Sequence, residues 1–301
     1  MENCTHRLGD IAQKAYLPFT TSQPDIQPIF CTRDASTLNA LAQQYRVAET
    51  TTRYQALLNF QPDAVMIHAA TSIHPEIARY FLEHGIATFV DKPLADSYQE
   101  CEALYQLAEQ KQVPLYIGFN RRHLPLIQEH SLSDIASLRS LRWEKHRHAL
   151  PGEAKTFLFD DFIHPLDSIN IHGDIDFEDI DIHYQKDGEK LARIDIKWQQ
   201  HGALFEASMN RQFGMTQEVI SSCHQDRAYR FDSFVNGECY QDNCTTQIQL
   251  KDWTPMLASK GFHGMFEQWK QVVATGKMDT KLIERNLSSH RIAQKLLDFI
   301  T

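Results

Sequence analysis

Residues 64–93 read AVMIHAATSIHPEIARYFLEHGIATFVDKP and contain one complete strand–helix–strand unit. The apolar run 64–70 is typical of a strand that is buried on both faces of a parallel sheet. Pro75 suits the first turn of a helix, and Gly85 is the residue type that commonly follows a helix end. Residues 88–90 form the next apolar run. This stretch therefore predicts parallel strands that are connected by helices.

The same alternation continues on both sides of this unit. A short apolar run at 29–31 precedes a helical stripe at 38–45, and a capping box from Ser97 to Glu100 begins a helix before the strand at 115–118. Repeated units of this kind specify a Rossmann-like, doubly wound α/β sheet. Such a sheet binds its ligand beyond the carboxyl ends of its strands, here at residues 8–12, 31–34, 69–75, 91–94 and 119–123.

The first strand of this sheet is the exception. Residues 7–12 read RLGDIA, which is like the end of a phosphate-binding turn, but Arg7 stands where the turn needs glycine. The preceding residues 2–6 are polar, so we expect the first strand to be atypical or missing. When residues 1–9 are back-translated with a choice among degenerate codons and read one nucleotide later, the new frame permits an apolar strand followed by G-x-G. A frameshift at the start of the gene is one hypothesis for this segment.

After about residue 120 the pattern changes to one helical stretch followed by alternating segments. Such segments are typical of an antiparallel sheet with one covered face and one freer face; they lie at 180–184, 192–198, 204–209 and 217–223. Helical spacing returns at 262–275 and 282–300. We expect a dinucleotide-binding domain at 1–119 and an α+β domain with a large open antiparallel sheet at 120–301, whose C-terminal helix packs back on the first domain.

Composition excludes several classes of protein. A formal net charge of −9 without a basic stripe argues against nucleic acid binding. The apolar runs are too short to span a bilayer, and the start lacks a signal-peptide pattern, so we expect a cytoplasmic protein. Six cysteines without C-x-x-C spacing indicate reduced thiols, and the histidines show no metal-binding motif, so we expect no metal.

Two segments contain residues that are suited to proton transfer. Lys92 follows Asp91 at the end of a buried strand, where it either pairs with that carboxylate or serves a ligand, and the residues favour neither reading. Asp160 and His164 share one face of a helix, so a carboxylate can lie beside an imidazole. On spacing alone, a helix start with acidic capping residues is the simpler reading. Of the other acids, we expect Asp161 to be exposed near the helix start.

Basic residues at 145–148 allow two readings of equal weight. Lys145, Arg147 and His148 either hold an anionic or polyhydroxyl substrate or form a solvated basic patch.

Taken together, these segments resemble the Gfo/Idh/MocA family of NAD(P)-dependent oxidoreductases, and in particular its MviM-type members, over nearly the whole chain from Leu8. The family's E-K-P motif appears as Asp91-Lys92-Pro93 with a shorter acid, and its T-P-N-x-x-H motif is matched loosely at 69–74. The G-x-N-x-R motif appears at 118–122. The D-x-x-x-H-x-x-D helix appears as Asp160, His164 and Asp167, of which Asp167 is expected to pack against the following chain.

This resemblance implies roles for individual residues. Lys92 would bind the substrate hydroxyl, His164 would be the general base, and Asp160 would hold the substrate or orient the imidazole, with Lys145 and Arg147 as further substrate ligands. The implied cofactor-binding residues are Leu8, Gly9, Asp10, Ile11, Thr32, Arg33, Ala70, Thr71, His74, Asp91, Lys92, Asn120 and Arg122.

The implied function is hydride transfer between a nicotinamide cofactor and a secondary hydroxyl of a sugar, polyol or related small molecule. The active site is expected in the cleft between the two domains. The alternative is a catalytically inactive dinucleotide- or sugar-binding protein on the same scaffold. Thr32 followed by Arg33 favours NADP over NAD, because arginine suits a 2′-phosphate. We also expect a homodimer or homotetramer formed through the open sheet face, on which alternating residues such as Ile194, Ile196 and Trp198 would need a cover.

Overall fold

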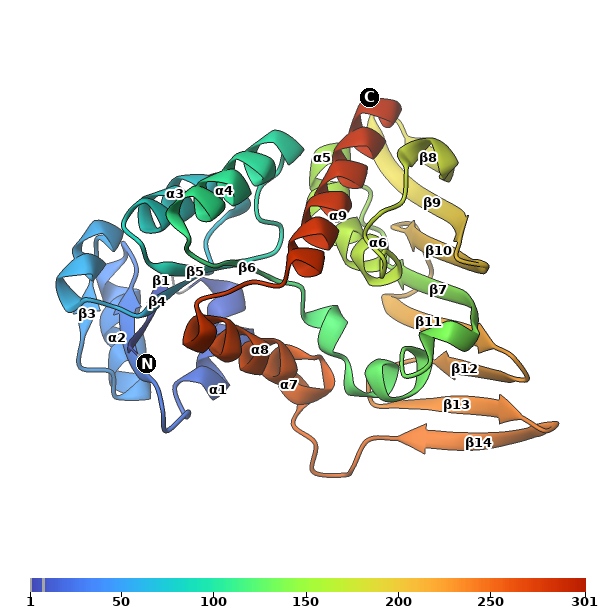
Figure 1. Ribbon diagram of the computed structural model, residues 1–301, viewed down its shortest axis with the longest axis horizontal. Helices are drawn as coiled ribbons and strands as arrows, with labels where there is room; N and C mark the ends of the chain where they lie inside the picture. Colours follow the sequence, from blue (N-terminus) through green and yellow to red (C-terminus); the bar gives the residue numbers. More distant parts are fainter. Residues whose placement is uncertain (1, 7–8) are drawn as a thin grey trace. The chain divides into compact units, whose positions relative to one another are not determined.

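The computed structural model describes residues 9–301 in full and the backbone of residues 2–6 (Figure 1). The chain divides into two compact units. The first is formed by Met1–Gly118 with Met265–Ile283, and the second by Phe119–Gly264 with Glu284–Thr301. Within the described part of the chain, no helix has the length and apolar character needed to cross a membrane.

The first unit contains a six-stranded sheet of parallel strands in the order β3-β2-β1-β4-β5-β6. The strands are β1 (Glu2–His6), β2 (Gln27–Cys31), β3 (Thr50–Thr51), β4 (Ala64–Ile67), β5 (Ala87–Asp91) and β6 (Leu115–Gly118). The helices are α1 (Leu17–Thr20), α2 (Ala35–Tyr45), α3 (His74–Glu83), α4 (Tyr98–Lys111) and most of α8 (Phe262–Thr275). This is the doubly wound Rossmann-like fold that the sequence predicts.

Strand β1 is present and has the polar sequence of residues 2–6, so of the two expected outcomes, an atypical or a missing first strand, the structure has the atypical one. Its backbone pairs in parallel with β2 on one side and with β4 on the other. Pairing on both sides satisfies the peptide groups of the strand whatever side chains it carries. Arg7 and Leu8 of the predicted turn lie outside the described residues. The carbonyl oxygen of Gly9 accepts a hydrogen bond of 3.1 Å from the amide of Gln13, so helical winding begins directly after this glycine.

The helix ends of this unit follow the local signals in the sequence. Ser97 Oγ accepts a hydrogen bond of 3.3 Å from the amide of Glu100 at the start of α4, which confirms the predicted N-cap. Pro75 lies in the first turn of α3, and Gly85 follows that helix with a φ of +75°. The order of the strands reverses between β1 and β4, so the loops after these two strands form the edge at which such sheets bind ligands.

The second unit contains an eight-stranded sheet in the order β14-β13-β12-β11-β7-β10-β9-β8. Its strands are β7 (Leu138–His146), β8 (Asp181–Asp187), β9 (Lys190–Gln200), β10 (Ala203–Asn210), β11 (Gln217–His224), β12 (Arg227–Phe231), β13 (Asn236–Gln241) and β14 (Cys244–Gln249). Its helices are α5 (Ala154–Thr156), α6 (Ile163–Ile169), α7 (Met256–Ser259) and most of α9 (Thr280–Ile300).

This second sheet is mixed and not purely antiparallel, which corrects the sequence prediction. Strands β7 and β10 run parallel, while the other neighbouring pairs are antiparallel. Parallel neighbours need a long crossover connection. The helical segment 154–169 together with β8 and β9 provides that connection.

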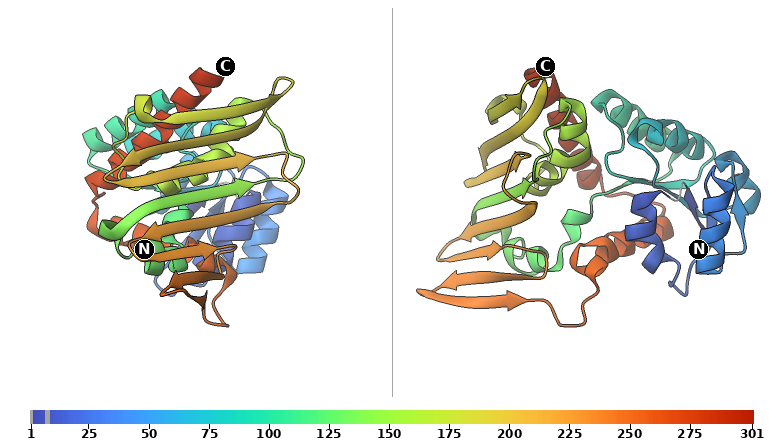
Figure 2. Two further views of the ribbon diagram at one scale, coloured as in Figure 1. Left: turned by 90° about the vertical axis from the view of Figure 1, so that its right-hand side faces the viewer. Right: turned by 180° about the vertical axis from the view of Figure 1, so that it is seen from behind.

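One face of the second sheet is covered by helices and the other face is open (Figure 2, left). Ile194, Ile196 and Trp198 belong to the buried core on the covered face. The open face carries ion pairs instead, such as Arg193 with Asp195 at 2.6 Å. The interpretation of those three apolar residues as an exposed dimer face is therefore wrong, and the oligomeric state stays a prediction.

Gly118 at the end of β6 leaves room for two aromatic side chains. A Cβ atom on Gly118 would lie 2.7 Å from Phe89 Cζ and 3.1 Å from the hydroxyl of Tyr16. Phe89 is fully buried and stacks on Tyr116 with the ring centroids 5.5 Å apart, so it has little freedom to move.

We expect Gly118→Ala to lower the free energy of unfolding by about 1–3 kcal/mol, because the added methyl group overpacks this core. Equilibrium denaturation in urea measures the change. Gly214→Ala is the matched control, since a Cβ atom there would meet nothing within 4 Å. Equal stabilities of the two variants would contradict the packing argument.

Candidate active site

Lys92 follows directly after β5 in the first unit, next to the partly buried carboxyl group of Asp91. Asp91 Oδ1 accepts a hydrogen bond of 2.7 Å from the hydroxyl of Tyr16. Burial raises the pKa of Asp91, and the positive charge of Lys92 acts against that shift. Burial and the neighbouring Asp91 raise the pKa of the Tyr16 phenol well above its usual value. The Tyr16 hydroxyl therefore keeps its proton, donates it in the hydrogen bond to Asp91 and holds that carboxyl group in place before Lys92.

His74, a predicted cofactor ligand, connects two of the loops at this edge of the sheet. Its Nδ1 lies 2.8 Å from the carbonyl oxygen of Pro93, and its Nε2 lies 3.0 Å from that of Ala69. Burial lowers the pKa of His74, and the contacts with the two carbonyl groups act in the opposite direction. Because both nitrogens face the backbone, the geometry supports a role in holding the loops. Direct contact of His74 with a cofactor stays a prediction.

The other predicted cofactor residues of this unit lie in the loops after β1, β2 and β4. Asp10 is exposed and pairs with Lys14 at 2.8 Å, and the neighbouring Ile11 is also exposed. Thr32 is buried after β2, whereas Arg33 is exposed. Beyond β4, Ala70 is exposed and Thr71 begins a short helical turn.

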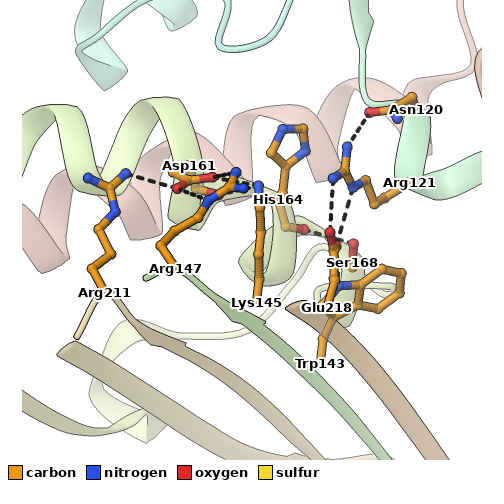
Figure 3. A network of polar contacts seen from close by, with 10 residues as sticks. All are labelled: Asn120, Arg121, Trp143, Lys145, Arg147, Asp161, His164, Ser168, Arg211 and Glu218. Carbon is orange, nitrogen blue, oxygen red and sulfur yellow. Dashed lines mark hydrogen bonds and ion pairs between the residues drawn. The ribbon is translucent and has the colours of Figure 1, made fainter. Parts of the chain in front are cut away.

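A carboxylate surrounded by three cations is the main electrostatic feature of the second unit (Figure 3). Asp161 Oδ1 lies 2.6 Å from Lys145 Nζ. Arg147 donates to both oxygens of Asp161 at 2.9 and 3.1 Å, and Arg211 donates to Oδ2 at 2.9 Å. Burial opposes ionisation of Asp161, but the charges of Lys145 and Arg147 outweigh it and hold the pKa of Asp161 far below its usual value.

His164 lies on α6, three residues after Asp161. Its side chain is buried, and its carbonyl oxygen accepts a hydrogen bond of 2.7 Å from the hydroxyl of Ser168. Asp160, by contrast, is exposed. The residues before α6 form a π-helical segment, Phe157–Phe162, a conformation that is frequent at functional sites.

A second ion pair lies on the other side of the His164 ring in Figure 3. Arg121 donates to the two oxygens of Glu218 at 3.3 and 3.0 Å, and the indole of Trp143 donates to the same carboxylate at 2.8 Å. The amide of Asn120 donates to the carbonyl oxygen of Lys260 at 2.8 Å. These contacts hold the segment that follows β6 against β7, β11 and the end of α7.

Asp167 and Arg122 form a further buried pair. Arg122 donates to both oxygens of Asp167 at 2.8 and 2.5 Å, and the hydroxyl of Ser289 donates to Oδ1 at 2.8 Å. Burial opposes ionisation of Asp167, and the charges of Arg122 and Arg285 outweigh it and lower its pKa. The geometry gives both residues a structural role, so the assignment of Arg122 to a cofactor stays a prediction only.

One expectation about charged residues, and one of two readings left open, are wrong. Asp161 is not exposed at a helix start but is 7% exposed within the cation cluster. Lys145 and Arg147 are not a solvated patch, since Lys145 is 3% exposed and both pair with Asp161. Lys145 has the same inward orientation on β7 as Leu141 and Trp143, and a lysine in such an apolar alternation is the signal that indicates a buried partner.

Arg211 and Glu218 also belong to the site although sequence reasoning did not single them out. Their partners, Asp161 and Arg121, are 50 and 97 residues away along the chain. No local pattern predicts pairs at such separations.

We expect Asp161→Ala to lower the free energy of unfolding by about 3–5 kcal/mol, because it leaves three cations without their shared partner. The folded-state pKa of Asp161 is depressed, so its contribution is present above the unfolded pKa of about 4 and is lost as pH falls through the folded value. The difference from the parent chain should therefore persist across neutral pH.

The matched control is Asp181→Ala, whose carboxylate is 80% exposed and lies 3.7 Å from Lys197. This exposed pair should contribute little. Chemical denaturation at pH 7 compares the two variants, and equal losses would contradict the assignment of Asp161 as the buried centre of this cluster.

Comparison with known proteins places these features in a family. Residues 8–119 match the model of the oxidoreductase family GFO_IDH_MocA, described as an NAD-binding Rossmann fold. A Gfo/Idh/MocA family oxidoreductase from Vibrio cholerae is 53% identical, with a TM-score of 0.97 over 100% of this chain and 98% of that chain. The dehydrogenase MviM from Clostridium difficile is 23% identical, with a TM-score of 0.89 over 99% of both chains.

A Salmonella typhimurium protein, YceM, which is named as an oxidoreductase, is 34% identical over 165 residues, or 54% of this chain. That match spans 52% of YceM, about half of its length. The match to the Vibrio structure, by contrast, extends over nearly the full length of both chains. The chain is a member of the Gfo/Idh/MocA family of NAD(P)-dependent oxidoreductases.

Proposed function

We propose that this chain transfers a hydride between NAD(P) and a secondary hydroxyl group of a sugar, polyol or related small molecule. The observation that carries the proposal is the buried His164 beside the cation cluster on Asp161, in a family of oxidoreductases. A relative that is 38% identical over 85 residues is named myo-inositol dehydrogenase Hyg17, from Streptomyces leeuwenhoekii. Its name supports a polyhydroxyl substrate for this chain.

The helix start at Gly9 and Asp10 is suited to a dinucleotide. The helical segment that begins after Gly9 presents its first amides at the carboxyl end of β1, at the reversal of the strand order. Free amides at a helix start are suited to a pyrophosphate group. Gly9 and Asp10 would hold the pyrophosphate, and the exposed Ala70 and Thr71 would border the cofactor. When bound, the nicotinamide ring supplies or accepts the hydride.

Lys92 and His164 have different roles at the reacting hydroxyl group: the first stabilises negative charge and the second accepts the proton. The ammonium group of Lys92 donates a hydrogen bond to the reacting oxygen and stabilises its negative charge as the carbon loses hydride. A ring nitrogen of His164 accepts the hydroxyl proton, as an imidazole can near neutral pH. Asp160 is exposed on the preceding turn and would bind another hydroxyl of the substrate.

The start of α2 supports a preference for NADP. A carboxylate after β2 would select NAD by binding the ribose hydroxyls. Asp34 is the acid nearest to that position, but its Oδ1 accepts a hydrogen bond of 2.6 Å from the amide of Thr37 as the N-cap of α2. This hydrogen bond lowers the pKa of Asp34. Arg33 remains exposed beside it and suits a 2′-phosphate.

We expect Arg33→Ala to weaken NADPH binding by about tenfold or more while NADH binding changes little, because a charged hydrogen bond to the 2′-phosphate is lost. Fluorescence titration of both cofactors measures the two dissociation constants. Lys111 is the exposed last residue of α4, on a different helix. Lys111→Ala also removes one positive charge and serves as the control. Equal effects on both cofactors, or tighter binding of NADH by the parent chain, would refute the preference.

We expect Lys92→Ala and His164→Ala each to lower kcat by roughly 10²–10⁴-fold, because each removes a group that acts only on the reacting hydroxyl. Cofactor reduction with a panel of sugars and polyols measures turnover. Dinucleotide affinity should change little in His164→Ala. The exposed His84 provides the control His84→Ala.

The outcomes separate the proposed enzyme from the inactive binding protein. Turnover by His164→Ala at the parent rate would show that the histidine is not the base. Dinucleotide binding without turnover of any compound would favour a binding protein on the same scaffold.

A further inference from the structure

A cavity of about 440 Å³ lies within the second unit, beside the candidate site. Lys145, Arg147 and Glu218 line it from β7 and the start of β11, and Lys260 lines it from the end of α7. Its volume is within the usual range for small-molecule sites. Figure 3 shows the side chains of Lys145, Arg147 and Glu218 beside His164 on α6. Lys145 and Arg147 also pair with Asp161, three residues before His164, so the cavity borders the helical segment that carries the proposed base.

The carboxylates at the cavity are already compensated by cations. Glu218 is paired with Arg121 at 3.0 Å, and Asp232, which also lines the cavity, is paired with Arg230 at 3.1 Å. Asp161 does not line the cavity, but it pairs with Lys145 and Arg147, which do, and with Arg211, which leaves an excess of two positive charges in that cluster. Asp160, the nearest additional acid in sequence, is not among the residues that line the cavity.

Lys260 adds a further positive charge. In the part of the chain that the structure describes, no ion pair is found for its ammonium group, although its carbonyl oxygen accepts the hydrogen bond from Asn120. This backbone contact fixes the end of α7, and the cavity is the place where the ammonium group can meet an anion. Several cations that line one cavity together attract an anion more strongly than one isolated surface cation does.

The remaining walls are suited to a small polyhydroxyl body. Phe234, Val235 and Met256 provide apolar surface, on which the C–H face of a sugar ring can pack. Ser233 and Thr216 provide hydroxyl groups. The cavity thus combines an apolar wall, hydroxyl groups and excess positive charge.

We infer that the substrate is a polyhydroxyl compound that carries an anionic group, a carboxylate or a phosphate, which binds between Lys260 and Arg147. This inference rests on the proposed function and narrows its substrate class. A neutral sugar would leave the excess positive charge of the cavity without a partner. An anionic sugar derivative would compensate it and present its hydroxyl groups to His164.

Calorimetric titration of the full chain tests this assignment with glucose, myo-inositol, gluconate, glucose 6-phosphate and myo-inositol 1-phosphate. At least one anionic probe should bind tenfold or more tightly than its neutral counterpart, and this difference should shrink as salt is added. The comparison of gluconate with glucose 6-phosphate distinguishes a carboxylate site from a phosphate site. If no anionic probe binds more tightly than its neutral counterpart, the inference is wrong.

Two substitutions that each remove one positive charge locate the binding site. Lys260→Gln should weaken binding of the anionic probe about tenfold and leave that of the neutral probe unchanged. Lys190→Gln, at the exposed start of β9, should change neither. Equal effects of the two variants would overturn the assignment to this cavity. The titration needs neither cofactor nor turnover, so the two proposals can fail separately. Anion binding without catalysis would refute the proposed function alone. Catalysis on neutral sugars without a preference for anions would refute this inference alone.

Discussion

The arrangement of the second unit depends on the burial of one carboxylate. A buried charge is costly unless it is paired and hydrogen-bonded, and Asp161 meets this requirement with Lys145, Arg147 and Arg211. Its three partners come from β7, from the residue after β7 and from the residue after β10. The same contacts therefore fix the helical segment 157–169 across two strands that are parallel neighbours. The position of His164, one turn further along, follows from this attachment.

Much of the first unit could be predicted because its signals are local. The apolar runs at β4 and β5, the capping serine of α4 and the glycine after α3 each act within a few residues. Strand β1 could not be predicted in the same way, since its polar sequence lacks the apolar run, and its pairing with β2 and β4 is decided by the neighbouring strands. The strand order of the second sheet is harder to predict, because the parallel pairing of β7 with β10 joins segments about 65 residues apart along the chain.

The candidate site divides along the same line. Lys92, Asp160 and His164 belong to short motifs, so the sequence alone identifies them as candidate site residues. The state of Asp161 could not be predicted, because an acid near a helix start is usually exposed and only long-range packing brings cations to it. Lys145 is intermediate. Its inward position on β7 is visible as a charge within an apolar alternation, yet the alternation does not say which carboxylate it meets.

The neighbourhood of Lys92 shows how a departure from a family motif can be linked to positions elsewhere. The family's motif has glutamate where this chain has Asp91, whose side chain is one methylene shorter. Tyr16 reaches this shorter acid from the helical segment after β1, with its hydroxyl 2.7 Å from Asp91 Oδ1. That hydroxyl occupies space next to Gly118, where a Cβ atom would approach it to 3.1 Å. Residues 16, 91 and 118 thus constrain one another, so a longer acid at position 91 would require a change at Tyr16, at Gly118 or at both.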